Sequence, residues 1–413
     1  MKIGEFSKMY NVSKDTLRYY VSIGLLSPRM QGSQMNFSER EEQNFKQIQK
    51  LKEMRFNIKE IRSFLYFQRV SNMIEPSTLD QCLDLLREKR EALLEEEKQI
   101  HESIAMIDQE AALLEAKKNL PVMQAGGVPL SAVSFLACPH CGASLSIENA
   151  SISKNSIYSG QLSCGCGFQA HIEDGILKTG MYYTGTHDQP DLTRCLYHDT
   201  GEEWVIHSAK CTDFMLEELK KKNLSGKVIL EANVNGFFFV YNFLQVLPKD
   251  CLYVIVDKYE EVLAMYKQYI EMLHPEMQVL YIADASERLP LKKASVDYDL
   301  TLFGENEYSL YHKNCQAWDI REILKPEAEI IGAIQSLPVD SVSRKNMMEK
   351  YPEGSERRLN AAYMKQDYEK AGFVLEMHLL GTVSKTLKHH MYTCHVDGEP
   401  LELYGFTARR DRK

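Results

Sequence analysis

Hydrophobic positions near the N-terminus follow two short helical repeats that are separated by a polar turn. The first repeat would bury one face, formed by Phe6, Met9 and Tyr10. Ser13 is placed to cap a second helix. Arg18 projects from the solvent face of this second helix. Gly24 and Pro28 then end that helix. This pattern predicts a helix-turn-helix, whose second helix can enter the major groove of DNA.

Helical periodicity continues through the next stretch of the chain. Ser38 and Glu41 form a capping box, and Asn57 and Glu60 repeat this signature before further apolar positions. We expect the two helices that follow these caps to support the helix-turn-helix, in a DNA-binding domain at residues 1–76.

Residues 79 to 118 carry apolar side chains at alternating steps of three and four, which is the heptad pattern of a coiled coil. The stripe consists of Leu79, Leu83, Leu86, Leu93, Ile100, Ile104, Ile107, Ala111 and Leu114, and Arg90 and Glu97 interrupt it. About 40 residues at about 1.5 Å each make a rod of about 60 Å. A stripe on such a rod favours a homodimer through a coiled coil at residues 77–120. The alternative is a helix that packs on its own domain.

The C-terminal half alternates strand and helix patterns, which predicts an α/β domain with a mostly parallel sheet at residues 226–413. The five expected strands are Val228–Ala232, Tyr253–Asp257, Val279–Asp284, Tyr298–Phe303 and Ile330–Ile334. Residues 181–225 are expected to form a helical connection that precedes this domain.

Length and composition are those of a folded protein with roughly two to four domains, because the 413 residues are 44% hydrophobic. No apolar run reaches about 18 residues and Met1–Glu5 lacks a signal-peptide pattern, so we expect a cytoplasmic protein without a membrane partner. Residues 1–70 contain 13 Lys and Arg against 7 Asp and Glu, and therefore carry +6, while the remainder carries −15 of the total of −9. A basic head on an acidic body fits a DNA-binding N-terminal end.

Two cysteine pairs lie within residues 130–180, among short alternating β-patterns. Cys138 and Cys141 form a C-x-x-C pair, and Cys164 and Cys166 form a C-x-C pair after 22 intervening residues. Thiolates on two tight turns are the ligands of a structural four-cysteine zinc ribbon, which leaves no open position for catalysis. The alternatives are a reduced cysteine cluster that binds nothing and a redox pair.

The run from Thr16 to Pro28, T-L-R-Y-Y-V-S-I-G-L-L-S-P, resembles the DNA-binding domain of MerR-type transcription regulators. The resemblance implies a winged helix-turn-helix, an antiparallel coiled coil, a double-stranded promoter DNA target and RNA polymerase as a partner. It assigns DNA contacts to Ser13, Lys14, Thr16, Arg18, Tyr19, Tyr20 and Arg29. The wing departs from the family, because Met35 stands where an arginine is typical. The alternative is an unrelated helical hairpin.

The α/β region resembles class I S-adenosylmethionine-dependent methyltransferases. Asp257 and Asp284 end two strands at the places where the acids of that family meet the ribose and the adenine. Leu289–Leu291 followed by Ala294–Asp297 resembles the loop before its fourth strand, and Arg321–Pro326 resembles the helix before its fifth. The resemblance therefore implies a cofactor site at the carboxyl ends of the strands.

The cofactor loop departs from that family, which has an acid followed by glycines at alternate positions. Here the loop reads E-A-N-V-N-G-F from Glu231 to Phe237, so that asparagines stand at two glycine positions. The resemblance assigns cofactor contacts to Glu231, Asn233, Asn235, Gly236, Asp257 and Asp284. Phe237–Phe239 would crowd this cleft or fill it completely.

Together these patterns predict a multidomain protein with a winged helix-turn-helix, a long coiled-coil helix, a small zinc ribbon and a Rossmann-like methyltransferase-fold domain. We expect a homodimeric MerR-type regulator whose methyltransferase-like domain senses S-adenosylmethionine or another small effector. No nucleophile or general base is recognisable after the fourth strand, so no catalytic residue is assigned. The alternative function is an active methyltransferase for RNA or a small molecule, fused to a regulator head.

Overall fold

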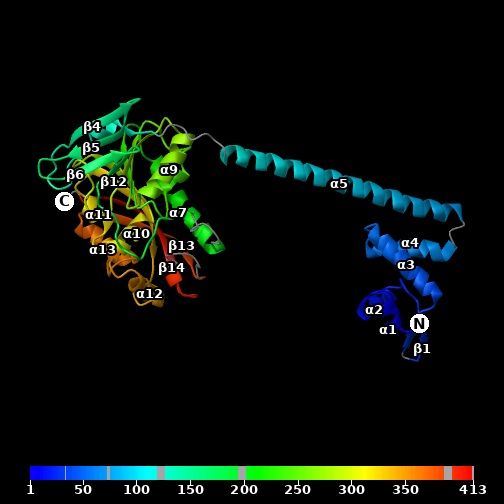
Figure 1. Cartoon of the computed structure of the whole chain (residues 1–413). Coiled ribbons are helices and arrows are strands. Elements are labelled where there is room, and N and C mark those ends of the chain that lie inside the picture. Colours follow the sequence, from blue (N-terminus) through cyan, green and yellow to red (C-terminus); the bar gives the residue numbers. More distant parts are fainter. Residues whose placement is uncertain (33, 72–74, 119–125, 194–200, 386–392, 412–413) are drawn as a thin grey trace. The chain divides into compact units, whose positions relative to one another are not determined.

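The computed structural model describes the chain except residues 33, 72–74, 119–125, 194–200, 386–392 and 412–413 (Figure 1). The chain divides into two compact units, Met1–Leu120 and Pro121–Lys413. Among the described helices, none combines the length and the apolar composition that a membrane span requires.

The N-terminal unit is helical apart from one small hairpin. Its elements are α1 (Ile3–Met9), α2 (Lys14–Ser22), β1 (Arg29–Gln31), β2 (Gln34–Asn36), α3 (Glu39–Glu53), α4 (Ile58–Ser71) and α5 (Pro76–Lys118). Ser13 caps α2 by accepting a hydrogen bond from the Thr16 N–H at 2.9 Å, and Ser38 and Glu41 form the capping box of α3. β1 and β2 pair antiparallel, which makes the wing of a winged helix-turn-helix.

Aromatic side chains form the centre of the core of this unit. Phe6 is completely buried, and its ring lies 4.6 Å from Tyr10 and 5.4 Å from Phe45 of α3. Met9 was expected in this core but is 63% exposed, so that expectation was wrong. Phe6 and Tyr10 lie one turn apart and already fill the contact with α3, which leaves Met9 on the flank of a short helix.

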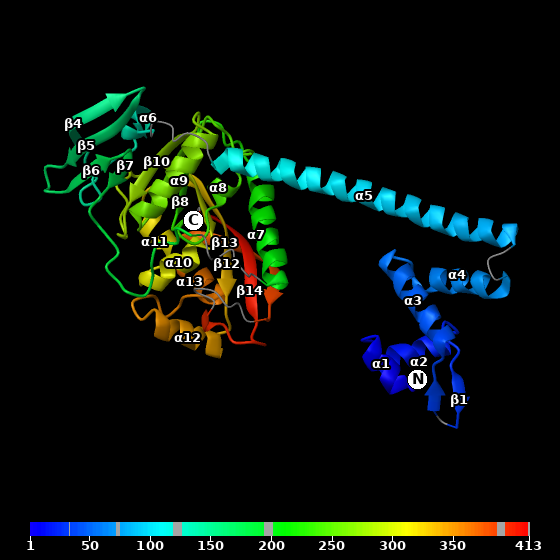
Figure 2. The ribbon, with the colours of Figure 1, turned by 45° about the vertical axis from the view of Figure 1, so that its right-hand side comes forward.

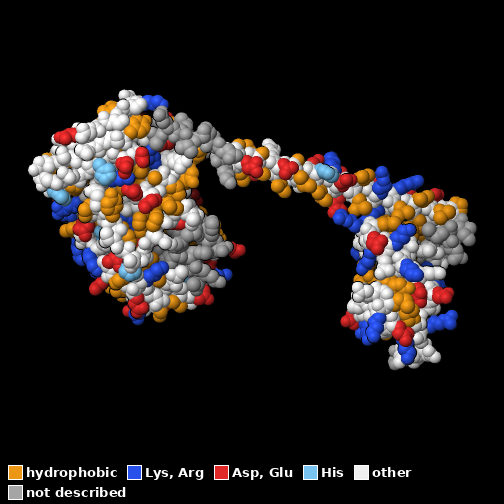
Figure 3. Space-filling view, viewed as in Figure 1, with side chains coloured by type: hydrophobic (Ala, Val, Ile, Leu, Met, Phe, Trp, Pro, Cys, Tyr) orange, Lys and Arg blue, Asp and Glu red, His pale blue; other side chains and the backbone are white. Residues whose placement is uncertain are grey.

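α5 is a single helix of 43 residues, and Pro76 stands at its first position, where a proline costs no hydrogen bond. Its first turns pack against α4, and Cys82 is 3% exposed there. Farther along, the apolar stripe lies in solvent: Ile100 is 49% exposed and Ile107 is 67% exposed (Figure 3). Most of the stripe therefore has no partner within this chain's described residues.

The C-terminal unit is built on one mixed sheet (Figure 2). Its main strands are β8 (Val228–Ala232), β9 (Leu252–Asp257), β10 (Gln278–Ala283), β11 (Val296–Leu302), β12 (Leu324–Ser336), β13 (Phe373–Val383) and β14 (Leu401–Arg410). Neighbouring strands follow the order β13-β14-β12-β11-β8-β9-β10, with β8 to β12 parallel to one another and β14 antiparallel to both β12 and β13. This is the sheet of a Rossmann-like methyltransferase fold, and it contains all five strands that the hydrophobic pattern predicts.

Helices cover both faces of this sheet. One core cluster holds residues of α7 (Glu202–Lys220), α8 (Phe239–Asn242) and α9 (Glu260–Leu273), and the other holds residues of α6 (Leu130–Val133), α11 (Gln316–Ile320) and α13 (Ala361–Lys370). α10 (Gly304–Tyr311) and α12 (Val342–Lys350) complete the unit. The helix expected at Arg321–Pro326 is displaced, because α11 ends at Ile320 and β12 begins at Leu324.

The cysteine-containing segment extends the same sheet. Its strands are β3 (Val128–Pro129), β4 (Ser146–Ser153), β5 (Ser156–Ser163), β6 (Gln169–Glu173) and β7 (Ile176–Lys178). β7 pairs parallel with β10 and antiparallel with β6, and β5 joins β6 to β4 and β3. The backbone hydrogen bonds of this segment therefore run directly into the α/β sheet.

Candidate functional sites

The surface of α2 presents cationic and aromatic side chains to solvent. Lys14 is exposed, the Arg18 side chain is 60% exposed and Tyr19 is 50% exposed. Arg18 pairs with Asp15 at 2.9 Å, an exposed ion pair that is weak and can be exchanged for a phosphate. These residues share one helix because Leu17 and Tyr20 turn its opposite side into the core.

Other residues assigned to DNA contact differ in how far they are available. Ser13 and Thr16 bond to each other at 2.7 Å between their hydroxyl oxygens, where they cap α2. Arg29 is exposed at the start of the wing, and Met35 is half-buried at the position where the family has an arginine. Tyr20 is 3% exposed, so its ring supports the helix from inside and does not offer a surface to a ligand.

The four cysteines converge at one end of the β4 to β7 extension. All four sulfur atoms lie within 4.8 Å of one another, with 3.4 Å between Cys138 and Cys166 and 3.5 Å between Cys141 and Cys164. Tetrahedral thiolates at about 2.3 Å from one zinc ion would stand about 3.8 Å apart, which this cluster nearly matches. The donor set therefore fits a four-cysteine metal site of the type that soft, tetrahedral ions prefer.

Backbone turns position these sulfurs, and hydrogen bonds among the thiols raise the pKa of Cys164 and of Cys166, whereas the pKa of Cys138 is lowered. Gly142, with φ of 75°, closes the first turn by donating to the Cys138 carbonyl at 2.8 Å. Burial raises the pKa of Cys138, but hydrogen bonds from the backbone N–H groups of Cys141 and His140 outweigh it and lower the pKa to about 7. A thiolate held in this way is the form that a metal ion binds.

At the carboxyl ends of the strands, the acid of the cofactor loop is buried and bonds to backbone groups of the protein. Glu231 is 1% exposed, and its two oxygens accept hydrogen bonds from the N–H groups of Phe239 at 2.6 Å and Val240 at 2.8 Å. Burial raises the pKa of this carboxyl to about 8. Glu231 therefore holds the start of α8 in place.

Both asparagines of the loop also have protein partners. Asn233 adopts φ of 61°, a conformation that glycine prefers and asparagine tolerates, and its amide donates to Gln316 at 3.2 Å. The Asn235 side chain accepts from the Asp191 N–H at 2.8 Å and donates to the Gln189 carbonyl at 3.2 Å. The expected glycine-like backbone is thus present at Asn233, while Asn235 joins the loop to a segment from earlier in the chain.

That earlier segment, residues 179–191, crosses the tips of three strands, and we call it the strap. Thr179 bonds to Ala283, the last residue of β10, and Met181 bonds to Ala285 just beyond it. Asp188 reaches Lys258 after β9, and the strap then meets Asn235 after β8. Ligands of doubly wound α/β folds bind at this edge. The strap was missed by the sequence reasoning because no local pattern shows which strand ends a connecting segment will touch.

Beneath the strap lies a buried charge cluster around Lys258. Its Nζ is 3.0 Å from Asp188 and 2.7 Å from Glu307, and the side chain is 6% exposed. Burial opposes the charge of Lys258, but Glu307 and Asp188 outweigh it and raise the lysine pKa. Asp257 accepts from the Asn235 N–H at 2.8 Å and the Tyr259 N–H at 2.9 Å, and burial raises its pKa to about 7.

The remaining assigned residues lie close by. The Gly236 N–H donates to Glu307 at 3.2 Å, so the loop and the charge cluster share a partner. Asp284 is 6% exposed and accepts from the Ser286 N–H at 2.6 Å, and burial raises the pKa of its carboxyl. The structure thus brings the six assigned cofactor residues to one edge of the sheet, where they bond largely to the protein itself.

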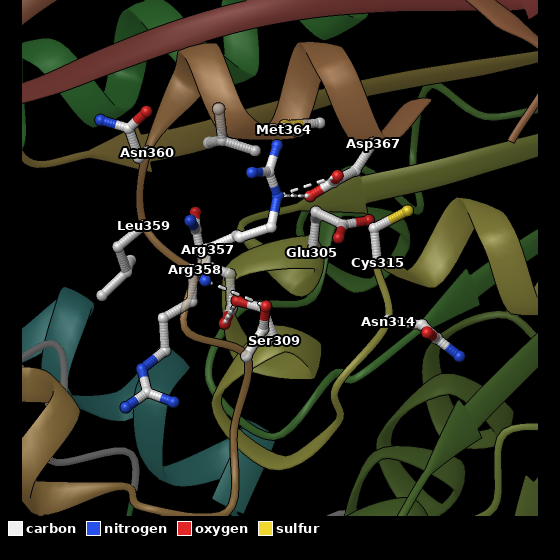
Figure 4. Close-up of a pocket in the computed structure, with 13 residues that line it drawn as sticks. Glu305, Ser309, Asn314, Cys315, Arg357, Arg358, Leu359, Asn360, Met364 and Asp367 are labelled. Atoms are coloured by element: carbon white, nitrogen blue, oxygen red, sulfur yellow. Dashed lines mark hydrogen bonds and ion pairs between the residues drawn. The ribbon is translucent and has the colours of Figure 1, made fainter. Parts of the chain in front are cut away.

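Side chains after β11 border a small internal pocket of about 30 Å³ (Figure 4). Arg357 points toward Asp367 and pairs with it at 2.8 Å, while Glu305 accepts from the Gln316 N–H at 3.1 Å and from the Tyr368 hydroxyl at 3.0 Å. A space of this size holds about one or two water molecules. The pocket beside Glu305 is therefore too small for a substrate, and the hydrogen bonds of this carboxylate support the local structure.

Comparison with known proteins supplies one family match. Residues 1–68 match the MerR HTH family of regulatory proteins. Comparison with curated protein sequences yields no match.

Solved structures similar to this chain include the YcgJ protein from Bacillus subtilis, at 11% identity and a TM-score of 0.39, over 48% of this chain and 99% of that one. A methyltransferase described as putative, from Bacillus halodurans, has 15% identity and a TM-score of 0.34, over 48% and 96% of the two chains. Phosphoethanolamine N-methyltransferase 2 from Haemonchus contortus, with S-adenosyl-L-methionine, has 14% identity and a TM-score of 0.36, and the match spans 48% of this chain and about half, 53%, of that enzyme.

The family match covers the helix-turn-helix and its wing, and the strand order describes the second unit independently. The chain therefore joins a domain of the MerR HTH regulatory family, at residues 1–68, to a C-terminal unit with a methyltransferase-like fold.

Proposed function

We propose that this protein is a homodimeric, MerR-type transcription regulator that binds double-stranded promoter DNA and senses a small-molecule effector through its methyltransferase-like unit. The observation that carries the proposal is the exposed Lys14, Arg18 and Tyr19 face of α2 within a domain of the MerR HTH family. Cations on such a helix neutralise phosphates and reach base edges in the major groove.

Dimerisation through α5 is supported by its apolar stripe. Ile100, Ile104 and Leu114 are 49%, 50% and 56% exposed on a helix of 43 residues. Burying such a stripe against a second copy removes apolar surface from water at about 25 cal/mol per Å². An antiparallel pair of these helices would hold two DNA-binding heads at a fixed separation, as a near-palindromic site requires. In the family that this head resembles, the regulator then acts on RNA polymerase.

Sensing rather than catalysis is supported by the hydrogen bonds that the polar side chains at the cofactor edge already make within the protein. Glu231, Asn235 and Asp257 all use their polar atoms on backbone groups of the same chain. A ligand at this edge would have to replace these bonds, which couples its binding to a rearrangement of the strap. By linkage, an effector that favours one arrangement shifts DNA affinity by the same factor as DNA shifts effector affinity.

We assign a structural zinc ion to Cys138, Cys141, Cys164 and Cys166. Thiolates at all four corners leave no position for water, so the ion would fix the two turns and take no part in chemistry. Because β7 pairs with β10, this ion would also stabilise one edge of the methyltransferase-like sheet.

A gel-shift experiment tests the central proposal. The full-length protein is titrated against DNA from upstream of its own coding region and against unrelated DNA of equal length, over a series of salt concentrations. We expect selective binding whose affinity falls linearly with the logarithm of salt concentration. Equal affinity for both DNAs at every salt concentration would refute sequence-specific regulation.

The second candidate is an active methyltransferase for RNA or a small molecule. The specific observation in its favour is that acids stand at the carboxyl ends of β8, β9 and β10, at Glu231, Asp257 and Asp284. Turnover of S-adenosylmethionine with any acceptor, lost on Asp257→Ala, would establish it. Binding of S-adenosylmethionine without turnover, coupled to a change in DNA affinity, would favour the sensor.

A further inference from the structure

A pocket of about 480 Å³ lies beside the strap at the carboxyl end of β9 and β10. Lys258 and Ala285, which follow these strands, form part of its wall. The strap contributes Tyr183 and His187, and Glu353 closes the pocket from the segment after α12. A volume of this size is in the range of small-molecule sites.

Tyrosine rings make up the apolar part of this wall. Tyr182 and Tyr183 of the strap and Tyr311 at the end of α10 all line the pocket. Tyr182 is 52% exposed, and the rings of Tyr183 and Tyr311 lie 5.0 Å apart, edge to face. Two of these rings already contact one cation, because the Lys258 ammonium lies 4.1 Å from the centre of the Tyr311 ring and 5.7 Å from that of Tyr183. Aromatic rings attract a cation through their negative faces.

The charges around the pocket do not balance. Lys258 has two carboxylate partners, Asp188 and Glu307, so that this group carries a surplus negative charge. Glu353 adds another carboxylate, whose ion-pair partner among the described residues is His187, at 3.1 Å, which is charged only when protonated. It accepts hydrogen bonds from the Tyr183 hydroxyl at 3.0 Å and from His187 at 3.1 Å. Burial raises the pKa of Glu353, but the hydrogen bonds it accepts outweigh this and lower the pKa.

We propose that this pocket binds an organic ammonium ion, with its positive centre against the rings of Tyr183 and Tyr311 and with Glu353 as its counter-ion. The combination of aromatic faces and a carboxylate whose ion-pair partner among the described residues is a histidine favours such a ligand over an anion, which Glu353 would repel. The inference rests on the proposed function, since it names the chemical class of the effector.

The site adjoins the cofactor edge that the fold family implies, because Lys258 and Ala285 directly follow Asp257 and Asp284. Glu231, Asn235 and Asp257 do not line this pocket, and their polar atoms are used on the protein backbone. The pocket is instead formed by the strap and by residues after β9, β10 and α12. A ligand bound here would contact the strap directly, and the strap bonds to the tips of three strands.

The test compares choline with 3,3-dimethylbutan-1-ol, which has the same shape without the charge. Both are titrated into the full-length protein without DNA, by calorimetry and by saturation-transfer NMR. We expect choline to bind at least about tenfold more tightly than its neutral counterpart, the difference that a cation–π contact and a carboxylate provide.

Variants then locate the binding. Tyr311→Leu and Glu353→Gln should each weaken choline binding severalfold, whereas Tyr311→Phe, which keeps the ring, should retain it. Glu271→Gln is the control, because this carboxylate pairs with Lys267 away from the pocket. Unchanged circular dichroism and melting temperature of the variants show that the fold is intact.

Equal binding of the two compounds, or no choline binding, would overturn the assignment of an ammonium site. Choline binding that is insensitive to Tyr311→Leu and Glu353→Gln would place the site elsewhere and would also overturn it. DNA affinity is measured separately with and without choline. A protein that binds choline but no promoter DNA would refute the regulator and leave the ammonium site standing.

Discussion

Replacement of Lys258 by methionine should destabilise the C-terminal unit strongly at neutral pH. The lysine side chain is 6% exposed and lies 3.0 Å from Asp188 and 2.7 Å from Glu307. Methionine fills most of the same volume but leaves these carboxylates without their cation. Breaking a buried ion pair in this way costs about 3–5 kcal/mol.

The loss should depend on pH in a defined direction. Unfolded Asp and Glu titrate near about pH 4. Burial raises the pKa of Glu307 despite the opposing charge of Lys258, and it raises that of Asp257 to about 7. Without the lysine these pKa values rise further, so the folded variant binds protons more tightly than the unfolded chain. The penalty is therefore small near about pH 4 and grows as the pH rises through about 7.

Urea unfolding followed by tryptophan fluorescence measures this effect in the relevant unit. The chain has two tryptophans, Trp204 and Trp318, and both belong to the C-terminal unit. Lys267→Met is the matched control, because Lys267 is 5% exposed but pairs with Glu271, which is 23% exposed and can be hydrated. We expect the control to lose clearly less stability than Lys258→Met.

Adding Glu307→Gln to Lys258→Met should recover part of the stability, since it removes one of the carboxylates that lost its partner. A loss below about 1 kcal/mol for Lys258→Met, or a loss of equal size at about pH 5 and about pH 8, would refute the reasoning. Either result would mean that water reaches the cluster and screens its charges.

Three further predictions concern the other sites. Arg18→Ala should weaken DNA binding and reduce the slope of log affinity against log salt concentration by about one. Lys220→Ala, at an exposed ion pair of the C-terminal unit, should change neither. Equal slopes for the two variants in a gel-shift series would remove Arg18 from the interface. Ile100→Lys with Ile104→Lys should give monomers in analytical ultracentrifugation, because charges in a coiled-coil seam cost several kcal/mol, to order of magnitude, whereas Gln99→Lys with Ser103→Lys should stay dimeric. Freshly reduced protein should contain one zinc ion per chain by elemental analysis, and absence of metal would contradict the assignment to the four cysteines.

Local patterns were sufficient wherever neighbouring residues in the sequence make the structure. The cap at Ser13, the capping box at Ser38 and Glu41 and the five parallel strands are all written in short stretches, and each is present. The convergence of the cysteine pairs follows from two tight turns, one before β4 and one after β5, because these two strands form an antiparallel pair. Periodicity predicted the burial of a single position less reliably, as Met9 shows. It indicates which face of a helix is apolar, but it does not show that Phe6 and Tyr10 already occupy the contact with α3.

Tertiary structure decided which residues the side chains at the carboxyl ends of the strands contact. Short stretches of the sequence indicated which strands exist and that Glu231, Asp257 and Asp284 stand at the carboxyl ends of three of them. They did not determine that Asp188, about 70 residues earlier, would meet Lys258 and Glu307, or that Tyr183 and Glu353 would share a pocket. Such partners are set by the path of the strap over the strand tips, and that path depends on the sum of many long-range contacts. Burial of charges in the resulting space is a property of the folded unit, because desolvation acts only once distant segments have excluded water.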